Sequence, residues 1–324
     1  MGWWQINTDT LARSRFVVSP LSETIATVQT LERGTAAHPG ERGWLDTCLP
    51  AYRARLAADP VTALLVRIGL GGRWNADFLT PTPDDTRDPA FDKELSRVSD
   101  TPPGAARADL EVSHGGPLPD LLRRPDLPDR AAELLAWVWS ETVRPEWPRR
   151  RRIIEADVVA RTRQLSQGGW AAALDDLRPG MRWLGDSRLQ VNAHDYPPRE
   201  LADARLLFAP VTRRQGWVSW DTDRGRYAVV YPCTGALADP ERTRVPDSLG
   251  NLLGPARASV LVLLDTPKST THLTALTGLA LGSVGRHLKV LFDAGLIRRR
   301  RAGRSVLYFR TEAGDVLVGA QDLS

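Results

Sequence analysis

Apolar residues in the first half of the chain recur at the spacing of amphipathic helices. Ser19 followed by Pro20 is typical of a helix start, and apolar side chains then follow every three or four positions to about Arg33. Residues 73–90 and 99–130 are rich in Pro, Gly and Asp, so we expect long loops there, on either side of one short helix. The helical spacing predicts further helices over about 41–58, 60–70, 90–98, 128–143 and 150–167.

Beyond Pro179 the pattern changes to short β-rich runs. Residues 206–208, 217–220 and 227–231 combine aromatic and β-branched side chains, and Asp221 to Gly225 is typical of a hairpin connection between the last two runs. We therefore expect an α+β fold, mainly helical, for an N-terminal domain over residues 1–245.

Residues 246–324 predict a different series of short elements. Pro255 starts a helix with apolar residues on one side, Gly278 separates two further helices, and Gly295 ends the second of them. This order predicts a winged helix-turn-helix domain over residues 246–324, in which the second helix of the pair enters the DNA major groove. The elements expected after the first helix are a short helix opened by Thr270 or Thr271, a helix over about 281–294, and a hairpin made of 297–301 and 304–310.

Composition limits the class of protein. A chain of 324 residues with 42% apolar and 25% charged residues is typical of a globular protein of about two domains. Its two cysteines, Cys48 and Cys233, exclude a disulfide scaffold and a four-cysteine zinc site, and Cys48 is expected to be a core residue. The sequence has neither a run of 18 apolar residues nor a signal peptide, so we expect a cytoplasmic protein without a membrane partner.

The net charge of +4 is unevenly distributed. Residues 1–245 hold 33 Lys+Arg and 33 Asp+Glu, whereas residues 246–324 hold 10 and 6. Residues 286–310 alone carry eight basic groups and one acid, which indicates a polyanion partner rather than a merely solvated helix and hairpin. The excess of 40 Arg over 3 Lys is expected from a GC-rich genome and is not by itself evidence of phosphate binding. For Arg149 to Arg152, a solvated helix start near carboxylates is favoured over contact with DNA, an acidic partner or an anionic ligand.

Helix geometry assigns roles within residues 281–294. At 100° per residue, Val284, Leu288 and Leu291 share one face and are expected in the core. Arg286 and Lys289 lie on the opposite face, where Arg286 is expected to read guanine with about 1–3 kcal/mol of discrimination and Lys289 to contact phosphate. The boundary residue His287 is expected to be structural or to contact phosphate rather than a metal. The candidate DNA-binding residues are Thr270, Thr271, Ser283, Arg286, His287, Lys289, Arg300, Arg301 and Arg304.

Residues 249–318 resemble the ArsR-type (ArsR/SmtB-like) family of winged-helix regulators. The resemblance rests on Arg286-His287-Leu288-Lys289-Val290-Leu291, Asp293-Ala294-Gly295-Leu296-Ile297, Arg300-Arg301, Gly303-Arg304 and Tyr308. It implies a homodimer that binds a near-palindromic operator in double-stranded DNA, represses transcription and releases DNA when an inducer binds. Residues 15–21 and 77–81 resemble the uncharacterised N-terminal extension of a larger subgroup of this family. This second resemblance does not indicate which activity the extension has.

The chain departs from this family in three places. Gly285 stands where members usually carry serine, and Gly282 and Gly285 each cost about 1 kcal/mol of helix propensity, so close approach of the backbone to DNA is a possible substitute for the serine. The helix from about 281 lacks a Ser N-cap. Residues 270–277 contain no cysteine and 312–319 no histidine, so metal sensing by the family's usual routes is not expected, nor is any cofactor.

Three functions remain open from the sequence. The favoured one is a regulator whose N-terminal domain dimerises, senses a small molecule, or both; a constitutive or architectural DNA-binding protein is the second. An enzyme fused to a DNA-binding module is disfavoured, because no Gly-x-Ser-x-Gly, phosphate-binding loop or His-Glu-x-x-His motif is present. Tryptophans of the N-terminal domain are expected either to pack in the core or to line a pocket for an aromatic or apolar ligand: Trp44, Trp74, Trp137, Trp139, Trp147, Trp170, Trp183, Trp217 and Trp220.

Overall fold

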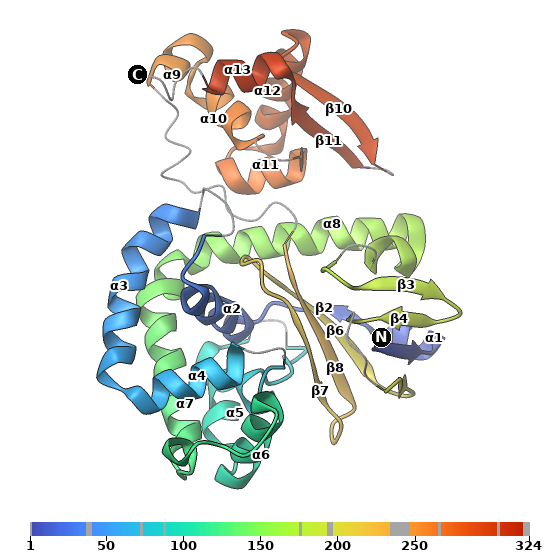
Figure 1. Ribbon diagram of the computed structural model, residues 1–324. Coiled ribbons are helices and arrows are strands. Elements are labelled where there is room, and N and C mark those ends of the chain that lie inside the picture. The colour runs from blue at the N-terminus through green and yellow to red at the C-terminus, as the bar shows by residue number, and fades with distance from the viewer. Residues whose placement is uncertain are drawn as a thin grey trace. The chain divides into compact units, whose positions relative to one another are not determined.

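A computed structural model shows a mixed α+β chain, mainly helical, as the sequence predicts (Figure 1). Its contacts separate into two compact bodies, the first made of residues up to 154 with 174–233 and the second of 155–173 with the C-terminal residues. The expected boundary at 245/246 lies outside the described residues, and 155–173 cluster with the C-terminal body rather than with the N-terminal one. The structure describes residues 2–36, 41–71, 74–86, 89–174, 177–192, 197–233, 247–264, 267–302 and 305–319.

Helices of the first body begin where the sequence places capping residues. The Ser19 hydroxyl accepts a hydrogen bond from the Ser22 amide at the start of α2, and Asp59 caps α4 in the same way through the Thr62 amide. Gly34 ends α2 in the left-handed conformation. The helices are α1 (Thr8–Arg13), α2 (Pro20–Arg33), α3 (Arg42–Ala58), α4 (Pro60–Leu70), α5 (Phe91–Ser99), α6 (Pro103–His114), α7 (Leu127–Val138) and α8 (Trp147–Leu174), with α8 interrupted at Gly169.

Two four-stranded sheets complete the first body. One has the order β3-β4-β1-β5 and the other the order β2-β6-β8-β7, in which β7 and β8 form the expected antiparallel hairpin. In each sheet a strand from the N-terminal end of the chain pairs with strands formed much later in the sequence. The strands are β1 (Trp3–Ile6), β2 (Arg15–Phe16), β3 (Arg182–Gly185), β4 (Arg188–Gln190), β5 (Arg199–Leu201), β6 (Arg205–Val211), β7 (Trp217–Asp221) and β8 (Arg226–Pro232).

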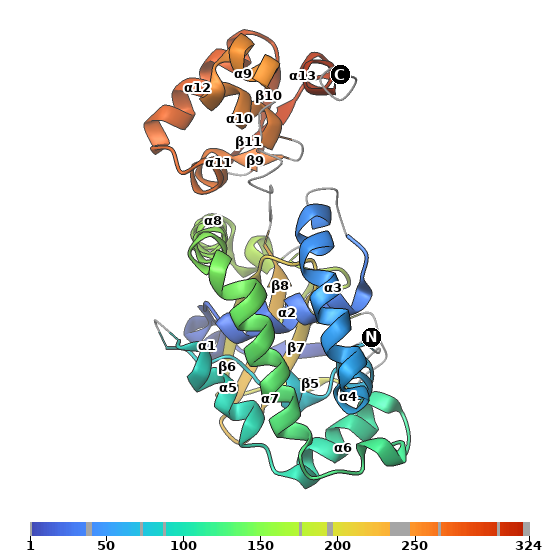
Figure 2. The same ribbon diagram turned by 90° about the vertical axis from the view of Figure 1, so that its left-hand side faces the viewer.

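One apolar core joins the helical layer to the second sheet. Side chains of α2, α4, α5 and α7 pack with Leu207, Ala209 and Val230 of β6 and β8 in a single buried cluster. Figure 2 shows α7 running between α5 and α4, both of which it contacts. This core holds α2 and α4 beside the strands of the second sheet. The cavity described below lies between these helices and that sheet.

The structure differs from the sequence predictions in two parts of the first body, α6 and β1. Helix α6 and a 3₁₀ turn over Asp120–Leu122 occupy part of the loop expected at 99–130. Ala106 and Leu110 of α6 are fully buried, so tertiary packing stabilises a helix whose Pro-rich surroundings disfavour it. The sequence also gave no sign of β1, whose partners lie about 190 residues away in the chain.

The C-terminal residues form a small core of their own. Helices α9 (Asp247–Leu253) and α10 (Pro255–Leu263) precede β9 (Lys268–Ser269), α11 (Thr270–Thr277) and α12 (Leu281–Asp293). Strands β10 (Ile297–Ala302) and β11 (Ser305–Arg310) follow, in a sheet of order β10-β11-β9, and then α13 (Glu312–Gly319). Gly278 and Gly295 both have φ of 70°, which explains the helix ends expected at these glycines.

Candidate functional site

Helix α12 has the buried face that its sequence predicts. Val284, Leu288 and Leu291 are all at most 1% exposed and pack with residues of α10 and α11. The three core assignments made from helix geometry are therefore confirmed. They fix the rotation of α12 about its axis and thus decide which side chains it presents to solvent.

The opposite face of α12 is polar and exposed. Arg286 and Lys289 are exposed, whereas Ser283 and His287 are half-buried. The Arg286 Nη2 donates a hydrogen bond to the Ser283 Oγ at 3.3 Å, and the Lys289 ammonium lies 2.9 Å from the Asp293 carboxylate. Exposed pairs of this kind contribute little to stability, so both cations can exchange their partners for a polyanion at small cost.

The two helices of the pair start differently. Helix α11 begins at Thr270, but its cap is Ser269, whose Oγ accepts a hydrogen bond from the His272 amide at 3.2 Å. Thr270 and Thr271 lie half-buried in the first turn. Helix α12 has Ala280 at its N-cap and no side-chain cap, as expected, so the first amides of α12 are not satisfied by a capping side chain.

The β10–β11 hairpin divides its arginines between two faces. Arg300 lies opposite Leu307 and Arg301 opposite Val306, and successive strand residues point to opposite sides of the sheet. Arg299, on the same side as Arg301, has its guanidinium carbon 4.9 Å from the centre of the Phe292 ring of α12. Arg299 is not among the DNA-binding residues expected from the sequence, and its contact with Phe292 places it beside α12. Arg304 lies outside the described residues.

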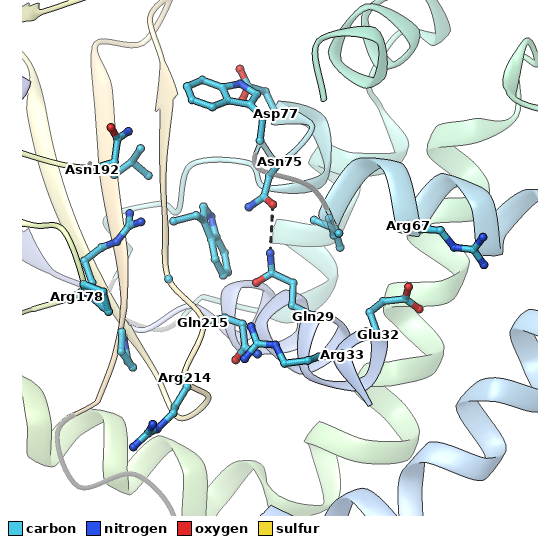
Figure 3. Close-up of a pocket in the computed structure, with 18 of the residues that line it drawn as sticks. Gln29, Glu32, Arg33, Arg67, Asn75, Asp77, Arg178, Asn192, Arg214 and Gln215 are labelled. Carbon is cyan, nitrogen blue, oxygen red and sulfur yellow. Dashed lines mark hydrogen bonds between the residues drawn. The ribbon is translucent and has the colours of Figure 1, made fainter. Parts of the chain in front are cut away.

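A cavity of about 670 Å³ opens in the first body (Figure 3). Its walls are contributed by helix α2, the end of α4, the segment after α8, and the β7–β8 hairpin with the residues just before β7. The Gln29 amide donates a hydrogen bond to the Asn75 Oδ1 at 3.3 Å across one side of the cavity (Figure 3). Its volume is within the range of about 300–1,000 Å³ that is typical of small-molecule sites.

The cavity is lined by more cations than anions. Arg33, Arg67, Arg178 and Arg214 line it, against two carboxylates. One carboxylate belongs to Glu32, which accepts a hydrogen bond from the Tyr52 hydroxyl at 2.7 Å. The other belongs to Asp77, and burial together with the nearby Asp109 carboxylate raises the pKa of Asp77 to about 6.

Three buried polar atoms on the cavity walls lack a hydrogen-bond partner among the described residues. They are the Arg178 Nη1, the Gln215 Oε1 and the Trp217 Nε1. A buried polar atom without a partner costs about 1–3 kcal/mol, and such atoms are exceptional in native proteins. Ten other atoms of this kind lie away from the cavity among the described residues, but these three border a space in which a polar ligand can bond to them.

Three of the nine tryptophans considered from the sequence line this cavity, namely Trp74, Trp217 and Trp220. The Trp74 and Trp220 rings lie 6.2 Å apart. Trp44, Trp137 and Trp139 instead pack against the apolar core. No sequence signal identified the cavity arginines, because they come from four segments that are far apart in the chain.

Other kinds of site find no support among the described residues. In that part of the chain, no three His, Cys, Asp or Glu side chains are grouped as metal ligands would be. No helix there is both long enough and apolar enough to cross a membrane. Burial raises the pKa of the Cys48 thiol, which disfavours the reactive thiolate.

Comparisons of the chain with models of protein families, with functionally curated proteins and with solved structures gave no significant match.

Proposed function

We propose that this protein is a cytoplasmic, sequence-specific DNA-binding regulator of transcription, of the winged-helix kind found in the ArsR-type family. In this proposal α11 and α12 are the helix-turn-helix, α12 reads the major groove and the β10–β11 hairpin is the wing. The chain carries out no catalysis, needs no metal or cofactor, and acts as an inducible repressor.

The observation that carries the proposal is the two-sided character of α12. Its apolar face is anchored by Val284 and Leu288, so its exposed face is held in a fixed orientation. That face presents Arg286 and Lys289, and Arg299 extends it onto the hairpin. A rigid helix with a basic outer face beside a basic hairpin matches the shape and charge of a major groove with its flanking phosphates.

The cavity in the first body favours an inducible regulator over a constitutive DNA-binding protein. A domain that only fixes dimer geometry has no need of a cavity of about 670 Å³ whose walls carry three polar atoms without a hydrogen-bond partner among the described residues. The proposed regulator is a homodimer on a near-palindromic operator, because two reading helices about 34 Å apart are needed to contact successive major grooves.

The test is DNA binding by the full-length protein, measured by fluorescence anisotropy on duplexes that tile the region upstream of its own gene. Arg286→Ala is expected to weaken binding to the preferred duplex by about five- to a hundredfold and to relax the preference at one base pair. Lys289→Ala is expected to weaken binding to all duplexes by a similar factor.

Arg257→Ala is the matched control, since Arg257 is an exposed arginine on α10, outside α12 and the hairpin. It is expected to leave sequence preference unchanged. Equal effects of Arg257→Ala and Arg286→Ala would refute the assignment of α12 as the reading helix, and no preference among the duplexes would refute sequence-specific regulation.

A further inference from the structure

We propose that the cavity of the first body binds a small planar organic anion, whose carboxylate or similar acidic group is held by Arg178. The flat part of the ligand lies against the tryptophans of the cavity wall. This inference concerns only the first body and its ligand, and it does not depend on DNA binding by α12.

The Arg178 guanidinium has no partner of opposite charge among the described residues. The Arg178 Nη1 is buried without a hydrogen-bond partner, and no described carboxylate forms an ion pair with this guanidinium. Burial lowers the pKa of Arg178 to about 10. The side chain as a whole is half-buried, and an anion in the cavity would give its buried Nη1 the hydrogen-bond partner that the described residues do not provide.

Three buried arginines of the same body differ from Arg178 because each has a carboxylate partner. Arg150 pairs with Glu23 at 2.8 Å, Arg213 pairs with Glu41 at 3.1 Å, and Arg226 contacts two carboxylates. The fold therefore supplies a carboxylate where an arginine is buried for structural reasons. Arg178 has no carboxylate partner among the described residues and borders a cavity, which distinguishes it from these three arginines.

The side chains that line the cavity carry a net positive charge. Arg33 of α2 and Arg214 before β7 line the cavity with Arg178, and neither forms an ion pair among the described residues. In Figure 3 the Arg33 side chain extends toward Gln215, with Arg214 on the same side of the cavity. A guanidinium binds a carboxylate through two parallel hydrogen bonds, so these groups favour an anionic head group.

The tryptophans of the cavity wall suit a planar ligand. Trp217 and Trp220 of β7 and Trp74 give the cavity flat apolar surfaces, and the Trp217 Nε1 has no acceptor among the described residues. Aromatic rings prefer offset or edge-on contacts with other rings, which a planar ligand can make without filling the cavity. A cavity of about 670 Å³ accommodates a molecule of one to three rings.

The test is isothermal titration calorimetry of the full-length protein with benzoate, indole-3-acetate and 2-naphthoate, each compared with its uncharged primary amide. At least one acid is expected to bind, and its amide is expected to bind at least about tenfold more weakly, because the amide cannot form the charged pair. No binding by any acid at about 10 mM would overturn the proposal, since even a Kd of about 1 mM would be detected there. Equal binding of acid and amide would overturn it as well.

Arg178→Gln is expected to weaken binding of the acid by about ten- to a hundredfold and to leave the amide unaffected. Arg182→Gln, an exposed arginine on β3 that does not line the cavity, is the matched control and is expected to change nothing. If Arg178→Gln does not fold, Arg33→Gln and Arg214→Gln replace exposed arginines and are each expected to weaken the acid severalfold. Folded variants that all bind the acid normally would overturn the assignment.

Discussion

The guanidinium of Arg150 lies 2.8 Å from the carboxylate of Glu23, and both side chains are fully buried. The same guanidinium donates to the Glu146 carboxylate at 2.7 Å, while Glu23 also accepts a hydrogen bond from the Thr212 amide. The sequence favoured a solvated start for this helix. The expected carboxylates lie beside Arg150. The prediction that Arg150 is solvated was wrong, because this buried side chain connects α8 to α2.

Arg150→Met is expected to lower the free energy of unfolding of the first body by about 3–5 kcal/mol, because it leaves Glu23 buried and unpaired. Urea unfolding followed by circular dichroism measures the loss. Arg152→Ala, an exposed arginine one half-turn further along α8, is the control and should change stability by less than about 0.5 kcal/mol. A small loss for Arg150→Met would show that the pair is not coupled to folding.

The hairpin register predicts different roles for its arginines in DNA binding. Arg299 and Arg301 share the face on which Arg299 contacts Phe292 of α12, whereas Arg298 and Arg300 point to the other face. Replacing Arg299 and Arg301 together by Gln is expected to reduce the slope of log affinity against log salt by about two. The pair Arg298→Gln and Arg300→Gln should leave the slope nearly unchanged, and the reverse result would place the opposite face of the hairpin on the DNA.

Glu94 makes stability depend on pH. Its Oε2 accepts hydrogen bonds from the Ser19 hydroxyl and the Leu21 amide, and burial raises the pKa of Glu94 to about 7. Because the folded state holds this proton more tightly than the unfolded state, the stabilisation is complete below about pH 4.5 and is lost as the pH rises through 7.

Glu94→Gln keeps an acceptor for both donors and removes the titration. The stability difference between variant and wild type is therefore expected to change by at most about 1.4 kcal/mol per pH unit between pH 5 and 7, in favour of the variant as pH rises. Urea unfolding at several pH values measures this difference. A difference independent of pH would mean that Glu94 does not titrate in this range.

The proposed anion site is also expected to respond to pH. The pKa of Asp77 is raised to about 6 by burial and by Asp109, while Arg199 opposes the rise. Below pH 6 Asp77 is neutral, and above it the carboxylate repels an anionic ligand. The affinity for benzoate is thus expected to fall severalfold from pH 5.5 to 7.5 in calorimetric titrations, and Asp77→Asn should flatten this dependence. A profile unchanged by Asp77→Asn would assign the dependence to another group.

The sequence predicted elements with local signals equally well in both bodies, such as the helix expected at 60–70 and observed at Pro60–Leu70. The helix expected at about 281–294 is observed at Leu281–Asp293, because its apolar period and the glycines at both ends are local signals. The strand Trp3–Ile6 had no such signal, since only its pairing with residues 188–190 and 199–201 makes it a strand.

The same distinction applies to the candidate sites. Arg286 and Lys289 were located by helical geometry alone, because the period of one helix determines both its buried and its exposed face. Arg178 belongs to no recognisable motif, since its significance depends on a cavity whose walls come from distant segments and on the lack of a described carboxylate partner. A run of basic residues in a sequence predicts a basic surface, whereas a single arginine on a cavity wall has no such pattern.

Pairing of β1 and β2 with late strands has a consequence for how the protein is made. During synthesis, β1 leaves the ribosome some 180 residues before β4, its antiparallel partner, and at 5–20 residues per second this interval is about 10–40 s. Throughout that time the Trp3–Ile6 segment has unpaired backbone groups and exposed tryptophans. The nascent chain is therefore at greatest risk of aggregation before its sheets form. Slower initiation of translation, together with chaperones, should raise the soluble yield more than mutations that stabilise the folded protein.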